Sequence, residues 1–502
     1  MMWVDKVLSR KEVFLFFLIL SFVYIYPIVH ADYAYIDDNW RSLLGAQDAW
    51  RNQGRVLIEW LYEALTFGSS TTNIFPLPLL LSIVVLVIAM SRLTVWYFPE
   101  PSVSSCLVVV PILCNPFFLG NLTYQYDGPA MILAVVAVIY AMTCRVERAS
   151  VRGLVVALLI AVTFSLYQLT IALFVGLCVV EFYLGVKAKA AVGEVLSVLA
   201  QRAGQLMGGG IFYFLTAYQL SVDTRGNLYP FNEHWFEEVC RKFIFAMNKI
   251  SLLVTPGNRW LCAAVLGIAL VGFVISMRSI PQMKGGKIGR VVVALLYLLC
   301  VPVLILIVPG FMLFLMEANL DARNYIAFSA VLIFLFMLNS EVLGRVESRL
   351  RLLLVIPVLF MFSFSYAYGQ VIIAKKELES ALAQYVAYDL ISHDELRNVH
   401  KLYYVGPAIG ANWLPRGHAA MTYMPLLRYI LSESNAPLHP QFMTRLGINN
   451  VVYGSRELFN ASVASQTDKL VVDSKLYSIH LRAGDAYIVM KDFVGSENYN
   501  DN

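Results

Sequence analysis

The stretch RGLVVALLIAVTFSLYQLTIALFVGLCVVEFYLGVK, residues 152–187, decides the fold class of this chain. A helix that crosses the hydrocarbon core of a bilayer needs roughly 20 apolar residues, so this run is too long for one membrane span. The polar and aromatic segment Ser165–Gln168 interrupts the run and leaves no room for a loop. The run therefore predicts two membrane helices that meet in a tight turn.

The rest of the chain carries the same signal. Hydrophobic residues make up 59% of the 502 residues and charged residues only 14%, which lies outside the usual composition of soluble domains. We therefore predict a polytopic α-helical membrane protein. Apolar runs of sufficient length predict about eleven transmembrane helices, near residues 12–30, 74–96, 104–121, 128–144, 152–169, 170–186, 204–221, 260–277, 291–310, 325–340 and 352–373.

The basic residues between the spans predict the orientation of the chain. Every second gap is rich in Lys and Arg, beginning with the segment Lys6–Lys11. Because such gaps stay in the cytoplasm, we expect the N-terminus inside and, after an odd number of spans, the C-terminal segment outside. The net charge of only +4 is spread between apolar segments, so no nucleic-acid partner is expected. Val29–Ala31 resembles a signal-peptidase site, but we interpret the long first span as an uncleaved anchor.

The composition changes to that of a soluble protein from about residue 374. A polar amphipathic helix over 375–392 is followed by the strand-like KLYYVG and NNVVYGS, the helical MPLLRYILS and the hairpin pattern KLYSIHLRAGDAYIVM. We predict a transmembrane domain over 1–373, which includes an amphipathic outer loop at 31–73, and a soluble α/β domain over 374–502 on the outer side, which would be the periplasm in a bacterium.

The outer loop between the first two spans bears the densest group of candidate residues. Apolar residues recur at helical spacing on both sides of Gly54, which predicts two amphipathic helices on the outer membrane surface. Asp37 and Asp38 directly precede the first helix, where one carboxylate is expected to cap it. Two adjacent carboxylates beside Arg41 could instead include a base that takes a proton from a hydroxyl acceptor. Both interpretations stay open.

Two further outer residues invite a functional interpretation. Asp127, in NLTYQYDGPAM, opens the fourth span and is either a helix cap, with Pro129 near the helix start, or part of a sugar site with the neighbouring tyrosines. Arg323, in MEANLDARNYIAF, either forms a surface ion pair with Asp321 or Glu317 or holds a lipid-linked phosphate in a bidentate contact.

The sequence offers no metal or nucleotide site. None of the seven His residues has the spacing of metal ligands. The glycines of KGGKIGR lack the GKS or GKT ending of a phosphate-binding loop. We therefore expect no cofactor and no metal.

An N-terminal span and three sequence motifs occur together in an order that is typical of one family. An N-terminal span is followed by DDNWRSLLGAQDAWRNQGR at 37–55, by YQYD at 124–127 and by SLYQ at 165–168. In this arrangement the chain resembles the serotype-converting O-antigen glucosyltransferases of bacteria and their phages, over most of the membrane region. The resemblance implies a GT-C-like fold whose active site lies on the periplasmic face of the bacterial inner membrane.

The resemblance also implies the reaction and its residues. A glucosyl group would move from polyprenyl-phosphate glucose to the O-antigen of lipopolysaccharide in one inverting displacement. Asp37 or Asp38 would act as general base, and Arg323 would hold the phosphate. The other expected substrate contacts are Arg41, Arg55, Tyr126, Asp127, Tyr167 and Gln168.

Two alternatives remain open at this stage. One is another transferase that depends on a polyprenyl-phosphate sugar but has a different sugar specificity. The other is a non-enzymatic flippase of lipid-linked sugars, or a polymerase. A flippase pathway would be lined by ionisable residues within the spans, and no run of such residues occurs here. A folded α/β tail would be an unusual addition to a polymerase.

Overall fold

The computed structural model describes residues 6–45, 48–68, 71–222, 226–405, 414–431, 443–463 and 468–491. The chain divides into two compact units. The first consists of Met1–Val29 and Ala46–Tyr366, and the second of His30–Gly45 and Ala367–Asn502. The loop at 31–73, which the sequence predicts to lie on the outer side, therefore contributes its beginning to the second unit and the remainder to the first.

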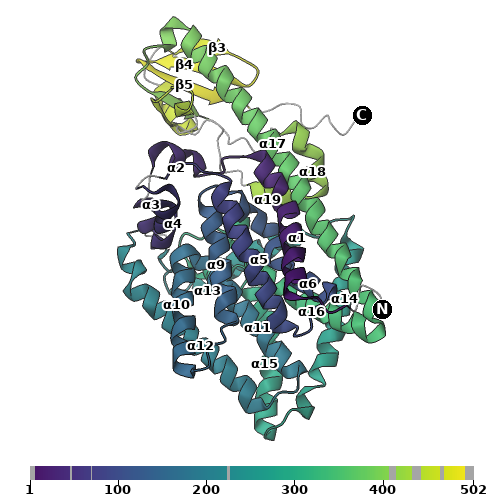
Figure 1. Cartoon of the computed structure of the whole chain (residues 1–502). Coiled ribbons are helices and arrows are strands. Elements are labelled where there is room, and N and C mark those ends of the chain that lie inside the picture. Colours follow the sequence, from purple (N-terminus) through teal and green to yellow (C-terminus); the bar gives the residue numbers. More distant parts are fainter. Residues whose placement is uncertain are drawn as a thin grey trace. The chain divides into compact units, whose positions relative to one another are not determined.

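Helices account for almost all of the first unit (Figure 1). They comprise most of α1 (Arg10–Ala31), then α3 (Asp48–Arg51), α4 (Val56–Thr66), α5 (Leu77–Tyr97), α6 (Val103–Val109), α7 (Pro111–Cys114), α8 (Leu119–Thr123), α9 (Asp127–Met142), α10 (Ala149–Tyr167), α11 (Ile171–Lys187), α12 (Val192–Leu215), α13 (Trp235–Ser251), α14 (Arg259–Met277), α15 (Lys287–Leu306), α16 (Phe328–Val346) and the beginning of α17 (Val355–Ser392).

Within the described residues, eight helical segments are long and apolar enough to cross a membrane, compared with the predicted number of about eleven. Each predicted span overlaps a helix, and the difference has three sources. α10 and α11 count as one segment, Ala149–Lys187, because only the short 3-10 helix η2 (Gln168–Thr170) separates them, at the predicted turn. α9 has only 16 residues. α12 is long enough, but its glycines and polar residues lower its hydropathy.

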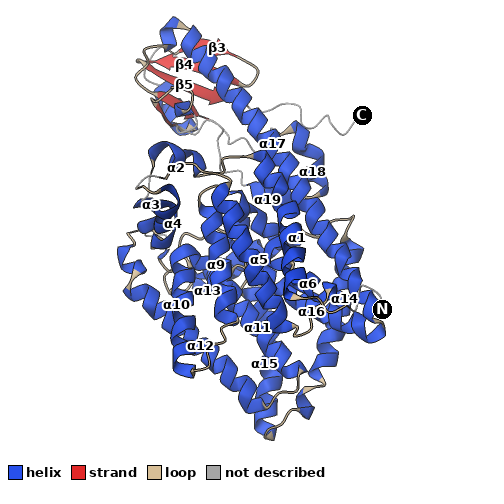
Figure 2. Cartoon of the chain, in the orientation of Figure 1, coloured by secondary structure: helices blue, strands red, loops and turns tan. Residues whose placement is uncertain are grey.

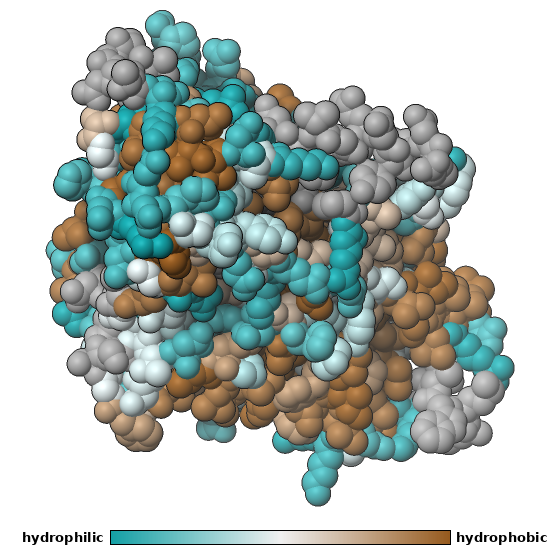
Figure 3. All heavy atoms as spheres, turned by 90° about the horizontal axis from the view of Figure 1, so that it is seen from above, coloured by the Kyte–Doolittle hydropathy of each residue, from teal (hydrophilic) through white to brown (hydrophobic). Residues whose placement is uncertain are grey.

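The lipid-facing character of the first unit is visible on its surface. α12, α14 and α15 expose large apolar side chains, such as Ile211, Leu270 and Leu295, which are 59%, 64% and 58% exposed. Figure 3 shows broad brown areas where apolar side chains reach the surface of the molecule. Proteins in water rarely expose contiguous apolar surface of this extent. The helices therefore have the surface of a membrane protein.

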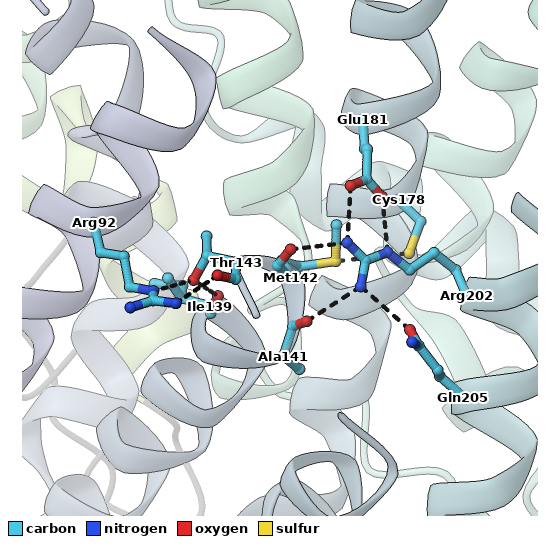
Figure 4. A network of polar contacts seen from close by, with 9 residues as sticks. All are labelled: Arg92, Ile139, Ala141, Met142, Thr143, Cys178, Glu181, Arg202 and Gln205. Carbon is cyan, nitrogen blue, oxygen red and sulfur yellow. Dashed lines mark hydrogen bonds and ion pairs between the residues drawn. The ribbon is translucent and has the colours of Figure 1, made fainter. Parts of the chain in front are cut away.

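α9 lies inside the first unit, packed against α5, α10 and α11, and nearly all its side chains are buried. Its C-terminal end is held by two arginines (Figure 4). Arg92 of α5 donates to Oγ1 and the carbonyl oxygen of Thr143, at 2.6 and 2.5 Å. Arg202 of α12 donates to the carbonyl oxygens of Ala141 and Met142, at 3.2 and 2.8 Å. The arginines thus satisfy carbonyl groups that the last helical turn leaves without partners.

All five named strands belong to the second unit (Figure 2). They are β1 (Leu402–Val405), β2 (Val451–Tyr453), β3 (Lys469–Asp473), β4 (Tyr477–Arg482) and β5 (Asp485–Met490), and they form one sheet in the order β2-β1-β5-β4-β3. β1 is parallel to β2 and β5, whereas β4 is antiparallel to β3 and β5. Among the described residues of this unit, the short α-helices are α2 (Asp38–Leu44), α18 (His418–Tyr423), α19 (Leu426–Leu431) and α21 (Arg456–Val463).

The predicted hairpin is present as β4 and β5. Ala483 and Gly484 form its turn with φ angles of 49° and 84°. Positive φ at both central residues is typical of the type I′ turn, which matches the twist of the flanking strands. The register pairs Arg482 with Asp485 next to the turn.

α17 is one continuous helix of 38 residues. The sequence predicts a membrane span at 352–373 and a separate amphipathic helix at 375–392, and the structure joins the two. In the second unit, Leu382, Val386 and Leu390 of α17 pack in one apolar core with Ile479 and Ile488 of the sheet. The change in composition near residue 374 marks a change of surroundings rather than the end of a helix.

Candidate functional site

Asp127 begins α9, and its side chain is only 4% exposed. The indole Nε1 of Trp50 donates to its Oδ1 at 2.8 Å, and Nη1 of Arg55 lies 4.0 Å from the same oxygen. A carboxylate in the first turn also interacts favourably with the helix dipole. Tyr126 occupies the N-cap position of α9. The carboxylate of Asp127 is therefore directed at Trp50 and Arg55 from a fixed place at the start of the helix.

Side chains of the short helices α3 and α4 hold the segment that leads into α9 in place. The rings of Trp50 and Tyr62 stack at a centroid distance of 5.4 Å and an angle of 10°. The hydroxyl of Tyr62 donates to the carbonyl oxygens of Gln125 and Tyr126, at 3.1 and 3.0 Å. The backbone before Asp127 is thus held by side chains from the outer loop.

Gly54 allows Arg55 to reach this place. It has φ of +70°, a conformation that residues with a side chain rarely adopt. A Cβ atom at Gly54 would lie 2.5 Å from the hydroxyl oxygen of Tyr213. The chain therefore turns sharply between α3 and α4 and passes close to α12.

The break between α10 and α11 delivers two of the predicted residues to Arg55. Nε of Arg55 donates to Oε1 of Gln168 at 2.9 Å, and the guanidinium carbon lies 4.9 Å from the centre of the Tyr167 ring. Nε2 of Gln168 in turn donates to the carbonyl oxygen of Gln53 at 2.8 Å and to the hydroxyl of Tyr213 at 3.1 Å. Two of the residues that contact Arg55, Tyr167 and Gln168, thus come from the SLYQ segment.

The segment that contains Arg323 joins the same network. The hydroxyl of Tyr167 donates to Oδ1 of Asn324, in the 3-10 helix η7 (Ala322–Asn324), at 2.9 Å. Nη2 of Arg323 lies 3.4 Å from Oδ2 of Asp321, which makes an ion pair. The guanidinium carbon of Arg323 lies 5.4 Å from the centre of the Tyr124 ring. Burial raises the pKa of the Asp321 carboxyl above its ordinary value. The predicted ion pair between Arg323 and Asp321 is therefore present.

Four predicted residues thus form one contact network in the first unit, namely Arg55, Asp127, Tyr167 and Gln168. Tyr126 is only 1% exposed, and its hydroxyl donates to the carbonyl oxygen of Thr71 at 3.3 Å. Tyr126 therefore packs beside the network and supports it. A carboxylate, an amide and a guanidinium at one point can both accept and donate hydrogen bonds, as the hydroxyl groups of a sugar require.

Asp37, Asp38 and Arg41 belong to the second unit, where the two aspartates differ sharply. Asp38 is 1% exposed and accepts a hydrogen bond from the backbone N–H of Tyr35 at 2.8 Å. Asp37 is the N-cap residue of α2, but its exposed side chain makes no capping hydrogen bond. Arg41 is buried, with its guanidinium carbon 5.6 Å from the centre of the Trp40 ring. Asp38 thus shapes the loop, while Asp37 presents a carboxylate to its surroundings.

The loop that carries Asp37 is strained and well anchored. Ile36 has φ of 48°, an outlier for a β-branched residue. The hydroxyl of Tyr33 donates to Glu379 at 3.1 Å, and the hydroxyl of Tyr35 donates to the carbonyl oxygen of Ile430 at 2.6 Å. Strain of this kind persists where the surrounding structure enforces it, and it gathers at functional sites.

The model of one protein family, Glucosyl transferase GtrII, matches residues 26–339. The chain belongs to this family. It is also similar to an "Uncharacterized 55.3 kDa protein in gtrB 5'region" of Salmonella phage P22, with 31% identity over 161 residues. That match covers 32% of this chain and 33% of the phage protein, so the chain spans about a third of the relative's length. No solved structure matches the chain.

The part of the chain matched by the GtrII model includes three site residues that the sequence did not single out, Trp50, Tyr62 and Asn324. The apolar spacing in α4 points to Leu57, Trp60 and Leu61, which are at least partly exposed, whereas Tyr62 is buried. In a membrane protein the apolar stripe of a surface helix can face lipid, so the polar and aromatic face packs inward. Applied to α4, that rule would have pointed to Tyr62.

Gly128→Ala is expected to lower both stability and glucosyl transfer. A Cβ atom at Gly128 would lie 2.7 Å from the backbone oxygen of Asn121, so the start of α9 must move. A displacement of about 1 Å at a reacting centre can cost roughly 10²-fold in rate, and we expect at least a tenfold loss here. Thermal unfolding of the solubilised protein and the rate of transfer measure the two effects.

Gly153→Ala is the matched control, because a Cβ atom at Gly153 in α10 would have no heavy atom within 4 Å. If both variants unfold and react alike, close packing at Gly128 does not position Asp127.

Proposed function

We propose that this GtrII-family protein transfers a glucosyl group from a polyprenyl-phosphate donor to the O-antigen of lipopolysaccharide, with inversion, at the periplasmic face of the inner membrane. The observation that carries the proposal is the network that buried Asp127 forms with the partly exposed Arg55 and Gln168 at the start of α9, in a chain of the glucosyl transferase family. These side chains supply the acceptors and donors that bind the hydroxyl groups of a sugar.

A lipid-linked donor suits the architecture. The first unit is built from apolar helices with lipid-facing surfaces, so a polyprenyl chain can stay in the membrane while its sugar phosphate reaches the network. The alternation of basic gaps supports a periplasmic place for the outer loop and for the start of α9.

The proposed reaction is a single displacement. The acceptor hydroxyl oxygen attacks the anomeric carbon and its proton passes to a general base, for which we propose the carboxylate of Asp37 from its place in the sequence motif at 37–55. The bond between the anomeric carbon and the phosphate oxygen breaks, and polyprenyl phosphate leaves with the electron pair. Arg323 stabilises the negative charge on the departing phosphate through its planar guanidinium. Asp127, Arg55 and Gln168 orient the sugar, which makes the attack effectively unimolecular.

The experiment that tests this proposal uses purified full-length protein with an O-antigen acceptor. We expect transfer from polyprenyl-phosphate glucose without any nucleotide sugar, and NMR of the product should show the anomeric configuration opposite to that of the donor. Transfer from UDP-glucose alone would contradict the donor assignment. Efficient transfer from a polyprenyl-phosphate carrying another hexose, but not glucose, would instead support a transferase of different sugar specificity.

A further inference from the structure

A cavity of ≈ 630 Å³ lies in the first unit between the C-terminal ends of α5, α11 and α16. The segment that leads from α5 into α6 and the segment that follows α16 complete its wall. The residues that matter for its chemistry are Tyr97, Glu100, Ser104, Lys187, Glu341 and Arg351. Sites for small molecules have volumes of roughly 300–1,000 Å³, so the cavity is large enough to hold one.

This cavity is separate from the Asp127 network. Glu181 lines the cavity and accepts two hydrogen bonds of 2.8 Å from Arg202, the residue that caps the C-terminal end of α9 (Figure 4). Asp127 stands at the opposite end of α9, and a helix of that length spans about 24 Å. The basic residues around the cavity also belong to gaps that the sequence places on the cytoplasmic side.

Tyr97 lines the cavity and carries a hydroxyl group that needs a hydrogen-bond partner. Tyr97 is 7% exposed, and its hydroxyl oxygen is buried without a hydrogen-bond partner among the residues that the structure describes. Buried polar groups are satisfied in the large majority of cases, so an orphan beside a cavity indicates a ligand that supplies the bond.

The cavity carries groups of both charges. Nζ of Lys187 lies 3.2 Å from Glu341, and Nε of Arg351 donates to the carbonyl oxygen of Ser340 at 3.2 Å. Glu100 is exposed at the rim, and the hydroxyl of Ser104 lies 2.9 Å from that of Ser102. The walls also include apolar side chains, among them Leu184 and Met337. A ligand that fits must carry an anionic and a cationic group together with an apolar part.

We propose that this cavity binds a phospholipid with a phosphoethanolamine headgroup. Lys187, Arg351 and the hydroxyl of Tyr97 bind the phosphate oxygens, while the carboxylate of Glu100 and the serine hydroxyls accept hydrogen bonds from the primary ammonium group. The glycerol and the first acyl carbons lie against the apolar wall. A quaternary ammonium has no N–H to donate, so a phosphocholine headgroup leaves these acceptors unsatisfied. The proposal does not depend on the proposed function.

The experiment measures lipid binding to the full-length, delipidated protein by native mass spectrometry. The probes are dioleoyl phosphatidylethanolamine, phosphatidylcholine and phosphatidylglycerol. We expect phosphatidylethanolamine to bind at least fivefold more tightly than the other two. Lys187→Gln should weaken its binding at least fivefold and Tyr97→Phe at least twofold. Lys189→Gln changes an exposed lysine two residues away that does not line the cavity, so it should have no effect.

Tyr97→Phe removes only an oxygen that has no partner, so this variant should fold normally. Equal binding of phosphatidylethanolamine and phosphatidylcholine would overturn the proposal, as would equal losses in Lys187→Gln and Lys189→Gln. Tighter binding of phosphatidylglycerol would assign the cavity to an anionic lipid and would overturn it as well.

Discussion

Asp37→Asn is expected to lower glucosyl transfer by roughly 10²- to 10⁴-fold, because an amide cannot accept the proton of the acceptor hydroxyl. The exposed side chain of Asp37 makes no capping hydrogen bond, so the thermal unfolding of the variant should match that of the natural protein. The measurement is the rate of glucose incorporation into O-antigen by the purified variant, supported by mass spectrometry of O-antigen from cells.

Variants of two neighbouring aspartates distinguish a catalytic role of Asp37 from a structural one. Asp32→Asn changes an exposed carboxylate 3.5 Å from Lys376 and should leave transfer within about twofold of the natural rate, as expected for a surface ion pair. Asp38→Asn keeps an oxygen that can accept from the backbone N–H of Tyr35, so we expect a smaller loss than for Asp37→Asn. Full activity in Asp37→Asn would remove this residue from the catalytic role.

Arg55→Lys is expected to lower transfer by about 10²-fold although the positive charge is kept. A guanidinium can contact Oε1 of Gln168 through Nε while Nη1 lies 4.0 Å from Asp127, and one ammonium group cannot reproduce this fork. The loss should appear in kcat as well as in the KM for the donor, because the sugar is both held and oriented by this network. Initial rates over a range of donor concentrations separate the two parameters.

Arg51→Lys is the matched control in the same loop. Arg51 also forms a two-point contact with a carboxylate, that of Glu59, through Nε at 3.1 Å and Nη2 at 2.5 Å. The side chain of Arg51 is 46% exposed and is not part of the network of Asp127, so we expect its transfer rate to stay within about twofold of the natural rate, as for most surface substitutions. Equal losses in the two variants would show that Arg55 stabilises the loop without a specific role in the sugar site.

Hydropathy allowed the helices of the first unit to be located from the sequence, because lipid imposes a uniform demand for apolar side chains along each span. The turn near Gln168 and the hairpin at Ala483 and Gly484 were also predictable, since each depends on local residues. The continuity of α17 was not, because the backbone remains helical while its surroundings change from apolar to polar.

The candidate site was only partly predictable for a different reason. Arg55 stands out as a charged residue in the loop after the first span, and Asp127 and Gln168 stand out as polar residues at the ends of spans. The structure connects the three. Trp50 and Tyr62 are aromatic, and aromatic side chains are so common at membrane surfaces that their type alone does not single them out. The difference between Asp37 and Asp38 depends on which side chain turns inward, and neighbouring residues of the same type give no indication of that.

Contacts at both ends of α9 fix the length of this short helix. Asp127 is tied to Trp50 at one end, and Arg92 and Arg202 hold the carbonyl groups at the other. One inserted residue would shift Asp127 by about 1.5 Å along the axis and turn it by about 100°. Side chains along α9 can change as long as they remain apolar and fit their neighbours, but the number of residues between the two anchors cannot. Selection on this helix should therefore tolerate substitutions and reject insertions and deletions.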